Sequence, residues 1–204
     1  MESESAAHRR WLNDAGEPLS LHFFDRPPDL PAPPDHVEIL TPWFRQLALK
    51  GGQGLVELAP VRVDHIPSIR LVAKGVLDDA SGRGRTYVGS LTLPFRDFSY
   101  VVKVQYREWG ITGVREAAVL DQRADLEDWL EGWIVDPSDP APPHLAMNLS
   151  EEPRYDSLFP NHPLSRVRRS LDALQASLTI VGEVKALPLF GSSGTRKQWW
   201  QVWR

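Results

Sequence analysis

The chain has 204 residues, a formal net charge of -4 and no cysteine. This length suits one domain with a single core and is short for two. The absence of cysteine excludes disulfides, thiolate zinc sites, iron–sulfur clusters and cysteine nucleophiles. The mild negative charge argues against a nucleic-acid partner, because such binders need a large basic surface to neutralise phosphates.

The N-terminal stretch, MESESAAHRRW, is polar and has no apolar segment of the kind found in secretory signals. No apolar run approaches the roughly 18 residues that a membrane helix needs. We therefore expect a cytoplasmic protein without a membrane partner.

The first third of the chain predicts a strand, a stiff connector and a helix. Residues 1–16 are expected to fray, with a short helix around Trp11, and residues 19–24 (LSLHFF) predict a strand. The proline-rich segment 26–36 is expected to lie on the protein's own surface rather than to bind a partner domain. Thr41 and Pro42 predict the start of a helix that ends before Gly51.

Residues 55–108 predict a meander of antiparallel strands. The clearest part is a hairpin over 86–108, in which apolar and polar residues alternate with the period of two of half-buried strands. Its turn lies at residues 94–97, because Pro94 cannot donate to a strand ladder. Short turns between successive strands favour antiparallel pairing.

The remainder predicts helices and a last strand. A strongly acidic stretch covers 116–139, and apolar residues at helical spacing follow Pro163 up to Leu178. We predict an α+β fold with an antiparallel β-meander sheet of about five strands and helices packed on one face. The domain is residues 1–191, with a core at 19–133, a C-terminal helical and edge-strand part at 150–190, and a tryptophan-rich basic tail at 192–204.

The order of these elements resembles the Mog1/PsbP-like fold group, over the strand at 19–24, the helix at 41–50 and the meander at 55–108. The resemblance covers about half of the chain and carries no specific residue motif. It implies a binding or assembly factor rather than an enzyme, although a fold alone does not determine function.

No local motif for metal, cofactor or catalysis is present. The six histidines form no HxH, HxxxH or HExxH pattern, so we predict no metal site and no cofactor. Asp64 and His65 in a predicted turn, together with Arg83 in the glycine-rich loop 81–85, are the first residues to consider for a dispersed site. That alternative is a small-molecule-binding protein or hydrolase near the turns 64–67 and 78–85.

A group of basic residues at the start of the helix after Pro163 is a candidate anion site. Its members are His162, Arg166, Arg168 and Arg169. The favoured interpretation is a polar helix face whose arginines pair with acidic residues of the same chain.

The C-terminal tail at 192–204 is the most distinctive candidate for a binding segment. It places aromatic and basic residues within a few positions: Arg196, Lys197, Trp199, Trp200 and Trp203. Each tryptophan buries about 150–250 Å² when covered, so exposure of all three would leave an aggregation-prone patch. Docking on the chain itself, docking on another protein or a second copy, and base stacking remain open in that order of preference.

These features together favour a non-enzymatic, cytoplasmic protein-interaction module such as an adaptor, chaperone or immunity-type binder. The partner is another protein or a second copy of the chain.

Overall fold

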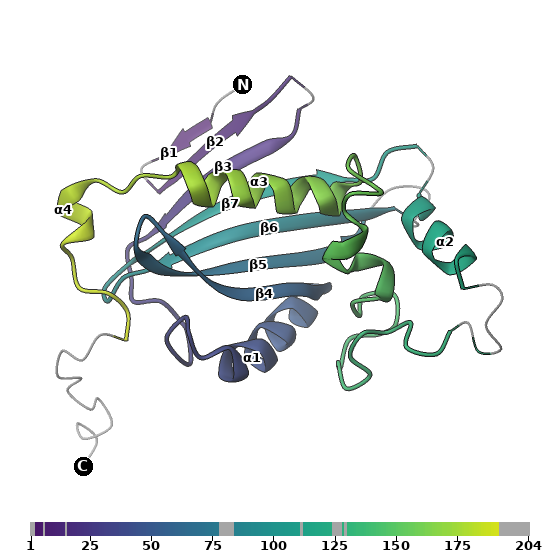
Figure 1. Cartoon of the computed structure of the whole chain (residues 1–204). Helices are drawn as coiled ribbons and strands as arrows, with labels where there is room; N and C mark the ends of the chain where they lie inside the picture. The colour runs from purple at the N-terminus through teal and green to yellow at the C-terminus, as the bar shows by residue number, and fades with distance from the viewer. Residues whose placement is uncertain are drawn as a thin grey trace, which may run out of the picture.

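A computed structural model describes residues 3–5, 7–14, 16–77, 84–110, 112–123, 128 and 130–191. In this part of the chain, seven strands form one antiparallel sheet in the order β1-β2-β3-β7-β6-β5-β4 (Figure 1). The strands are β1 (Ser3–Ser5), β2 (His8–Leu12), β3 (Pro18–Phe24), β4 (Gln53–Val63), β5 (Ile66–Val76), β6 (Arg85–Pro94) and β7 (Ser99–Arg107). The helices are α1 (Val37–Lys50), α2 (Val114–Asp121), α3 (Pro163–Ser177) and α4 (Gly182–Lys185), with 3-10 turns η1 (Leu149–Glu151) and η2 (Pro153–Tyr155).

The predicted meander is confirmed. Strands β4 to β7 pair in sequence order, and in the central hairpin Leu91 lies opposite Val102. Strand β3 then pairs with β7, so that Leu21 also lies opposite Val102 and the N-terminal strands extend the sheet. The α+β class is confirmed, and the sheet is larger than expected because residues 3–5 and 8–12 form strands β1 and β2. The expected short helix around Trp11 is wrong, since pairing with β3 satisfies this backbone instead.

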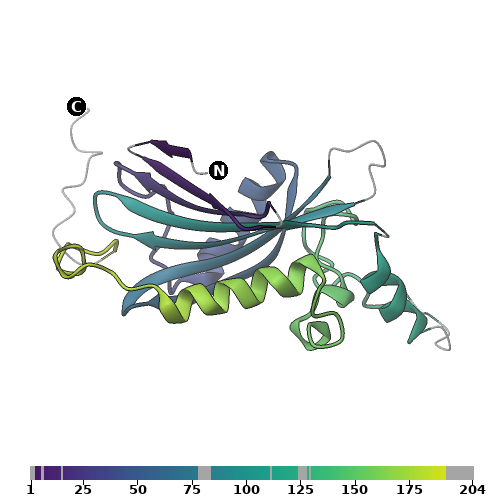
Figure 2. The ribbon, with the colours of Figure 1, turned by 90° about the horizontal axis from the view of Figure 1, so that it is seen from above.

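Helix α3 covers one face of the sheet. Its buried residues Leu164, Val167 and Leu171 pack in the main core against β6 and β7, and Figure 2 shows the helix lying along the sheet. Gly89 of β6 permits this approach, because a Cβ there would lie 2.6 Å from Val167 Cγ1. The spacing of apolar residues after Pro163 correctly predicted which face of α3 is buried.

Helix α1 packs on the opposite face, so the expectation that all helices cover one face is wrong. Its Leu40 forms a second core cluster with Ile69 and Ala32, and Ile69 alternates along β5 with Arg70, which contacts α3. Strand β5 is buried on both faces, so each face needs a cover. Buried Ala32 comes from the proline-rich segment, which confirms that this segment lies on the protein's own surface.

Two elements differ from expectation. Helix α1 begins at Val37 rather than at Thr41 and contains Pro42 inside it. The edge strand expected near 184–189 is replaced by α4 and an isolated bridge between Phe95 and Leu189. Among the described residues, no helix has the length and apolar character needed to cross a membrane.

Candidate functional site

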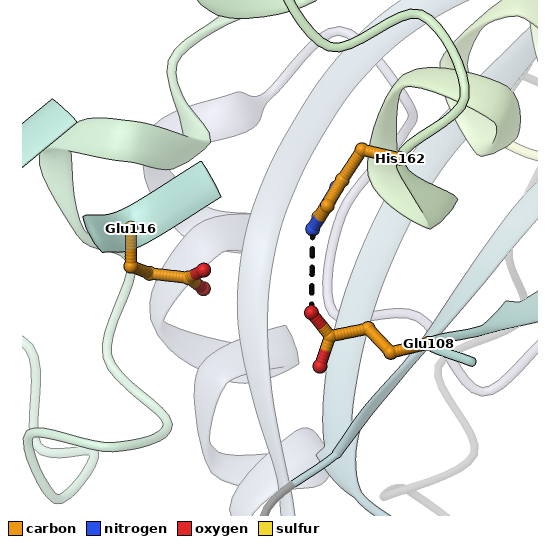
Figure 3. Close-up of side chains that lie close together, drawn as sticks. All are labelled: Glu108, Glu116 and His162. Atoms are coloured by element: carbon orange, nitrogen blue, oxygen red, sulfur yellow. Dashed lines mark ion pairs between the residues drawn. The ribbon is translucent and has the colours of Figure 1, made fainter. Parts of the chain in front are cut away.

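Three ionisable side chains meet at one end of the sheet. Glu108 directly follows β7, Glu116 lies in the first turn of α2, and His162 is the N-cap of α3. Their ligand-type atoms all lie within 4.8 Å of one another, and Figure 3 shows the three side chains turned toward a common point. The fold creates this cluster, because the three residues are far apart in the sequence.

Glu108 is the fixed member of the cluster. Its Oε2 accepts the Arg85 amide at 2.7 Å, its Oε1 accepts the Gly113 amide at 3.3 Å, and Oε1 lies 3.6 Å from His162 Nε2 (Figure 3). Burial works to raise the pKa of Glu108, but His162 and the two amides outweigh burial and lower that pKa. Glu108 is therefore held as a carboxylate.

Glu116 and His162 each present a buried atom without a hydrogen bond among the described residues. These atoms are Glu116 Oε2 and His162 Nε2, and the His162 side chain is only 9% exposed. Burial raises the pKa of Glu116, and the nearby carboxylates of Glu108 and Glu151 raise it further. Since buried polar atoms in native proteins nearly always have a partner, this pair of atoms is unusual.

The neighbouring Glu151, unlike Glu116, has hydrogen-bond partners for both carboxylate oxygens. This fully buried carboxylate accepts Lys74 Nζ at 2.6 Å, the Tyr87 hydroxyl at 3.1 Å and the Asn148 amide at 2.9 Å. Burial and the carboxylates of Glu151, Glu116 and Glu108 raise the pKa of Tyr87 well above its ordinary value. Glu151 thus belongs to a saturated structural network and has no oxygen left for a ligand.

The His162 ring has a defined proton position. Its Nδ1 accepts the Leu164 amide at 3.2 Å and caps α3, which places the ring proton on Nε2, on the side of the carboxylates. Side-chain caps from serine, threonine, aspartate or asparagine at this position stabilise a helix by about 1 kcal/mol.

A second candidate site is an open hollow of about 230 Å³ beside the β2–β3 turn. Arg10, Gln105, Arg107 and Trp109 line it together with residues 16–18. Within the described residues neither Arg10 nor Arg107 forms an ion pair, and the Arg107 guanidinium stacks 3.8 Å from the Trp109 ring, which is 69% exposed. The hollow can therefore accept an anionic group next to an aromatic surface.

The adjoining sheet face continues this cationic character. Strand registers place His8, His22 and Lys103 on the face opposite α3, with the His8 and His22 rings stacked at 4.5 Å. Burial lowers the pKa of His22, and the positive charge of Lys103 lowers it further. We call Arg10, Lys103, Arg107 and Trp109, with the two histidines, the cationic face.

A smaller hollow of about 120 Å³ lies between α1 and β4. Its Arg45 binds Asp136 at 2.6 Å and Asp139 at 3.2 Å. Hydrogen bonds from Ser138 and Arg45 lower the pKa of Asp136 to about 2. These ion pairs fasten the segment after Trp133 to α1, so we assign this hollow a structural role.

The predicted arginine group is dispersed by ion pairs within the chain. Arg166 binds Glu17, Arg168 binds Glu57 and Asp156, and Arg169 donates to the carbonyl oxygen of Pro160. Arg168 is also buried, although the helix pattern had placed it away from the core. Of this group only His162 joins a cluster with unpartnered atoms.

The other predicted residues contribute little to either site. Asp64 Oδ2 accepts Lys185 Nζ and the Ile180 amide, both at 2.6 Å, so it holds the C-terminal segment, while His65 is exposed in the turn. Arg83 lies outside the described residues. So does the whole predicted tail, with Arg196, Lys197, Trp199, Trp200 and Trp203.

Comparisons with models of known protein families and with curated proteins give no match. The resemblance to the Mog1/PsbP-like group therefore stays a prediction.

Proposed function

We propose that this chain is a non-enzymatic binding protein that acts in the cytoplasm and engages an acidic surface of another protein. The cationic face makes the main contact, and the tryptophan-rich stretch at 192–204 adds a second one. The observation that carries this proposal is the pair Arg10 and Arg107, which line an open hollow without an ion pair among the described residues.

The composition of the hollow supports an interface. Arginine and tryptophan are the residues most enriched at binding hot spots, and Trp109 is 69% exposed beside the Arg107 guanidinium. Lys103 extends the positive charge along the sheet, on a chain whose formal net charge is -4. A carboxylate-bearing partner complements this face in charge and is drawn to it over long range.

The hollow is poorly equipped for catalysis. Among the described lining residues the one carboxylate is Glu17, which Arg166 binds at 2.5 Å; that hydrogen bond lowers the pKa of Glu17, so it makes a weak general base. The alternative of a hydrolytic or small-molecule site near residues 64–67 gains no support, because Lys185 and the Ile180 amide occupy Asp64.

The test starts with identification of the partner. Full-length protein is cross-linked in host cells, the captured protein is purified, and binary affinity is measured with purified components. We expect the Arg10→Gln and Arg107→Gln double variant to weaken binding at least about tenfold, while Arg62→Gln at the distant β4–β5 turn leaves it unchanged.

Two further experiments distinguish the contact made by the cationic face from the contact made by residues 192–204. A chain ending at Gly191 is expected to lose affinity while keeping the salt dependence that the cationic face provides. Light scattering on the free protein reports self-association through the acidic stretch at 116–139. Unchanged binding by both the double variant and the truncated chain would refute the proposal, as would tighter binding to a single-stranded oligonucleotide than to any protein.

A further inference from the structure

We propose that Glu108, Glu116 and His162 form a binding site for one divalent transition-metal ion of the zinc type. The residues come from the end of β7, the first turn of α2 and the N-cap of α3, and Figure 3 shows their side chains converging. Their ligand atoms lie within 4.8 Å of one another, which requires only a small inward movement to reach a common ion at about 2.0–2.2 Å. This inference is independent of the proposed function.

The first observation in its favour is the unpartnered pair of atoms. His162 Nε2 belongs to a side chain that is nine-tenths buried, and Glu116 Oε2 is buried as well. Neither atom has a hydrogen bond with a described residue, and Figure 3 shows the His162 ring and the Glu116 carboxylate turned toward the side of Glu108. One cation between the three side chains would give each of these atoms a partner.

The second observation is charge. Neither Glu108 nor Glu116 forms an ion pair with a lysine or arginine of the described residues, and Lys74 is committed to Glu151. Among the described residues, the one ion-pair contact of these two carboxylates is the 3.6 Å approach of His162 Nε2 to Glu108 Oε1. A buried site of this charge favours a divalent ion, which neutralises both carboxylates.

The ligand types indicate which ion. Two carboxylate oxygens and one imidazole nitrogen suit zinc, whereas calcium and magnesium prefer six or more oxygen ligands. The Arg85 and Gly113 amides bind the Glu108 carboxylate and orient it, as outer-shell partners orient ligands in known metal sites.

Metal binding has a specific cost at His162. Its Nδ1 accepts the Leu164 amide, which places the ring proton on Nε2. When Nε2 binds the ion, this proton moves to Nδ1, and the capping hydrogen bond to Leu164 breaks. The Leu164 amide resonance is therefore expected to shift on metal binding, which gives the site a spectroscopic signature of its own.

The experiment is a Zn²⁺ titration of the full chain after removal of metals with a chelator. The stacked pair His8 and His22 is a second place where zinc can bind, so the background carries His8→Asn and His22→Asn. In that background we expect one Zn²⁺ per chain, a higher melting temperature and a shifted Leu164 amide resonance.

The decisive variant is His162→Asn in the same background. Asparagine keeps the helix cap but removes the imidazole ligand, so we expect zinc affinity to fall about 100-fold or more, beyond what loss of an outer-shell partner causes. Glu116→Gln is expected to weaken binding in the same direction, and the exposed His144→Asn to leave it unchanged. Equal zinc affinity in His162→Asn and its background, or no stoichiometric binding in that background, overturns the proposal.

Discussion

The Arg166 guanidinium of α3 binds the Glu17 carboxylate, which immediately precedes β3, through two nitrogen–oxygen contacts of 2.5 Å. The two residues are 149 positions apart, and their ion pair fastens the N-terminal hairpin to the helix that covers the main core. It also explains why Arg166 is not free to bind an external anion.

Glu17→Gln should therefore destabilise the protein in a pH-dependent way. The hydrogen bond from Arg166 lowers the pKa of Glu17 below its ordinary value of 4.5, so the native state holds fewer protons here than the unfolded state. The stabilisation is complete above pH 4.5 and is lost as the pH falls through the lowered pKa. We expect the variant to lose about 1–2 kcal/mol of unfolding free energy at pH 7 in urea titrations.

The matched control for Glu17 is Asp97→Asn, since the Arg96–Asp97 pair is more than half exposed on both sides. Such a pair contributes little, and no measurable change is expected. A difference between wild type and Glu17→Gln that stays constant down to pH 2 would contradict this assignment.

Lys74→Met should be one of the most damaging single changes in the sheet. The substitution leaves the fully buried Glu151 carboxylate without its cation, and breaking such a pair costs about 3–5 kcal/mol. The double variant Lys74→Met with Glu151→Gln removes the stranded charge and should recover part of that loss. Urea unfolding of both variants measures this, and a double variant no more stable than Lys74→Met would show that charge is not the cause.

His65→Gly should stabilise the β4–β5 turn. His65 has φ of 72° and Asp64 has φ of 46°, a left-handed pair that two-residue hairpins fill best with asparagine and glycine. Glycine at position 65 relieves backbone strain of about 1 kcal/mol. The melting temperature is expected to rise, whereas Asp64→Asn should lower it, because Asp64 binds Lys185 and the Ile180 amide. A fall in melting temperature for His65→Gly would assign its side chain a role beyond the turn.

Glu116→Gln should have opposite effects with and without zinc. Burial raises the pKa of Glu116, so the native state binds more protons here than the unfolded state, and this residue's contribution to stability declines as the pH rises above 4.5. In chelator-treated protein at pH 8 we expect the variant to melt higher than wild type, with no difference at pH 4. With Zn²⁺ present the order should reverse, because the variant lacks a charged ligand. Scanning calorimetry at both pH values provides the measurement.

The sequence predicted most of the sheet and the helix that covers its main face. The alternation of apolar and polar residues in 86–108 indicates a strand buried on one side. The spacing of Leu164, Val167 and Leu171 indicates one apolar face of a helix. Both signals are local, so a single sequence carries them. Strands β1 and β2 were missed because their polar residues form strands only through pairing, β2 with β3 and β1 with β2.

The candidate sites were not predictable in the same way. Glu108, Glu116 and His162 occupy three separate elements, and each is an ordinary polar residue in its local context. Arg10 and Arg107 meet only because β2 and β7 both flank β3 in the sheet. The Asp64 and His65 pair stood out locally, yet its prominence reflects turn geometry rather than chemistry.

By itself the sequence determined the class of the fold, the central hairpin and the inward face of α3, since hydrophobic periodicity depends on neighbours a few positions apart. Only the tertiary structure decided which charges are neutralised and which stay unpaired. Arg166 and Arg168 find acidic partners far along the chain, while Glu116 Oε2 and His162 Nε2 have no hydrogen bond among the described residues. The reason is physical: Coulomb interactions and metal coordination depend on distance through space, and the order of residues along a chain does not fix that distance.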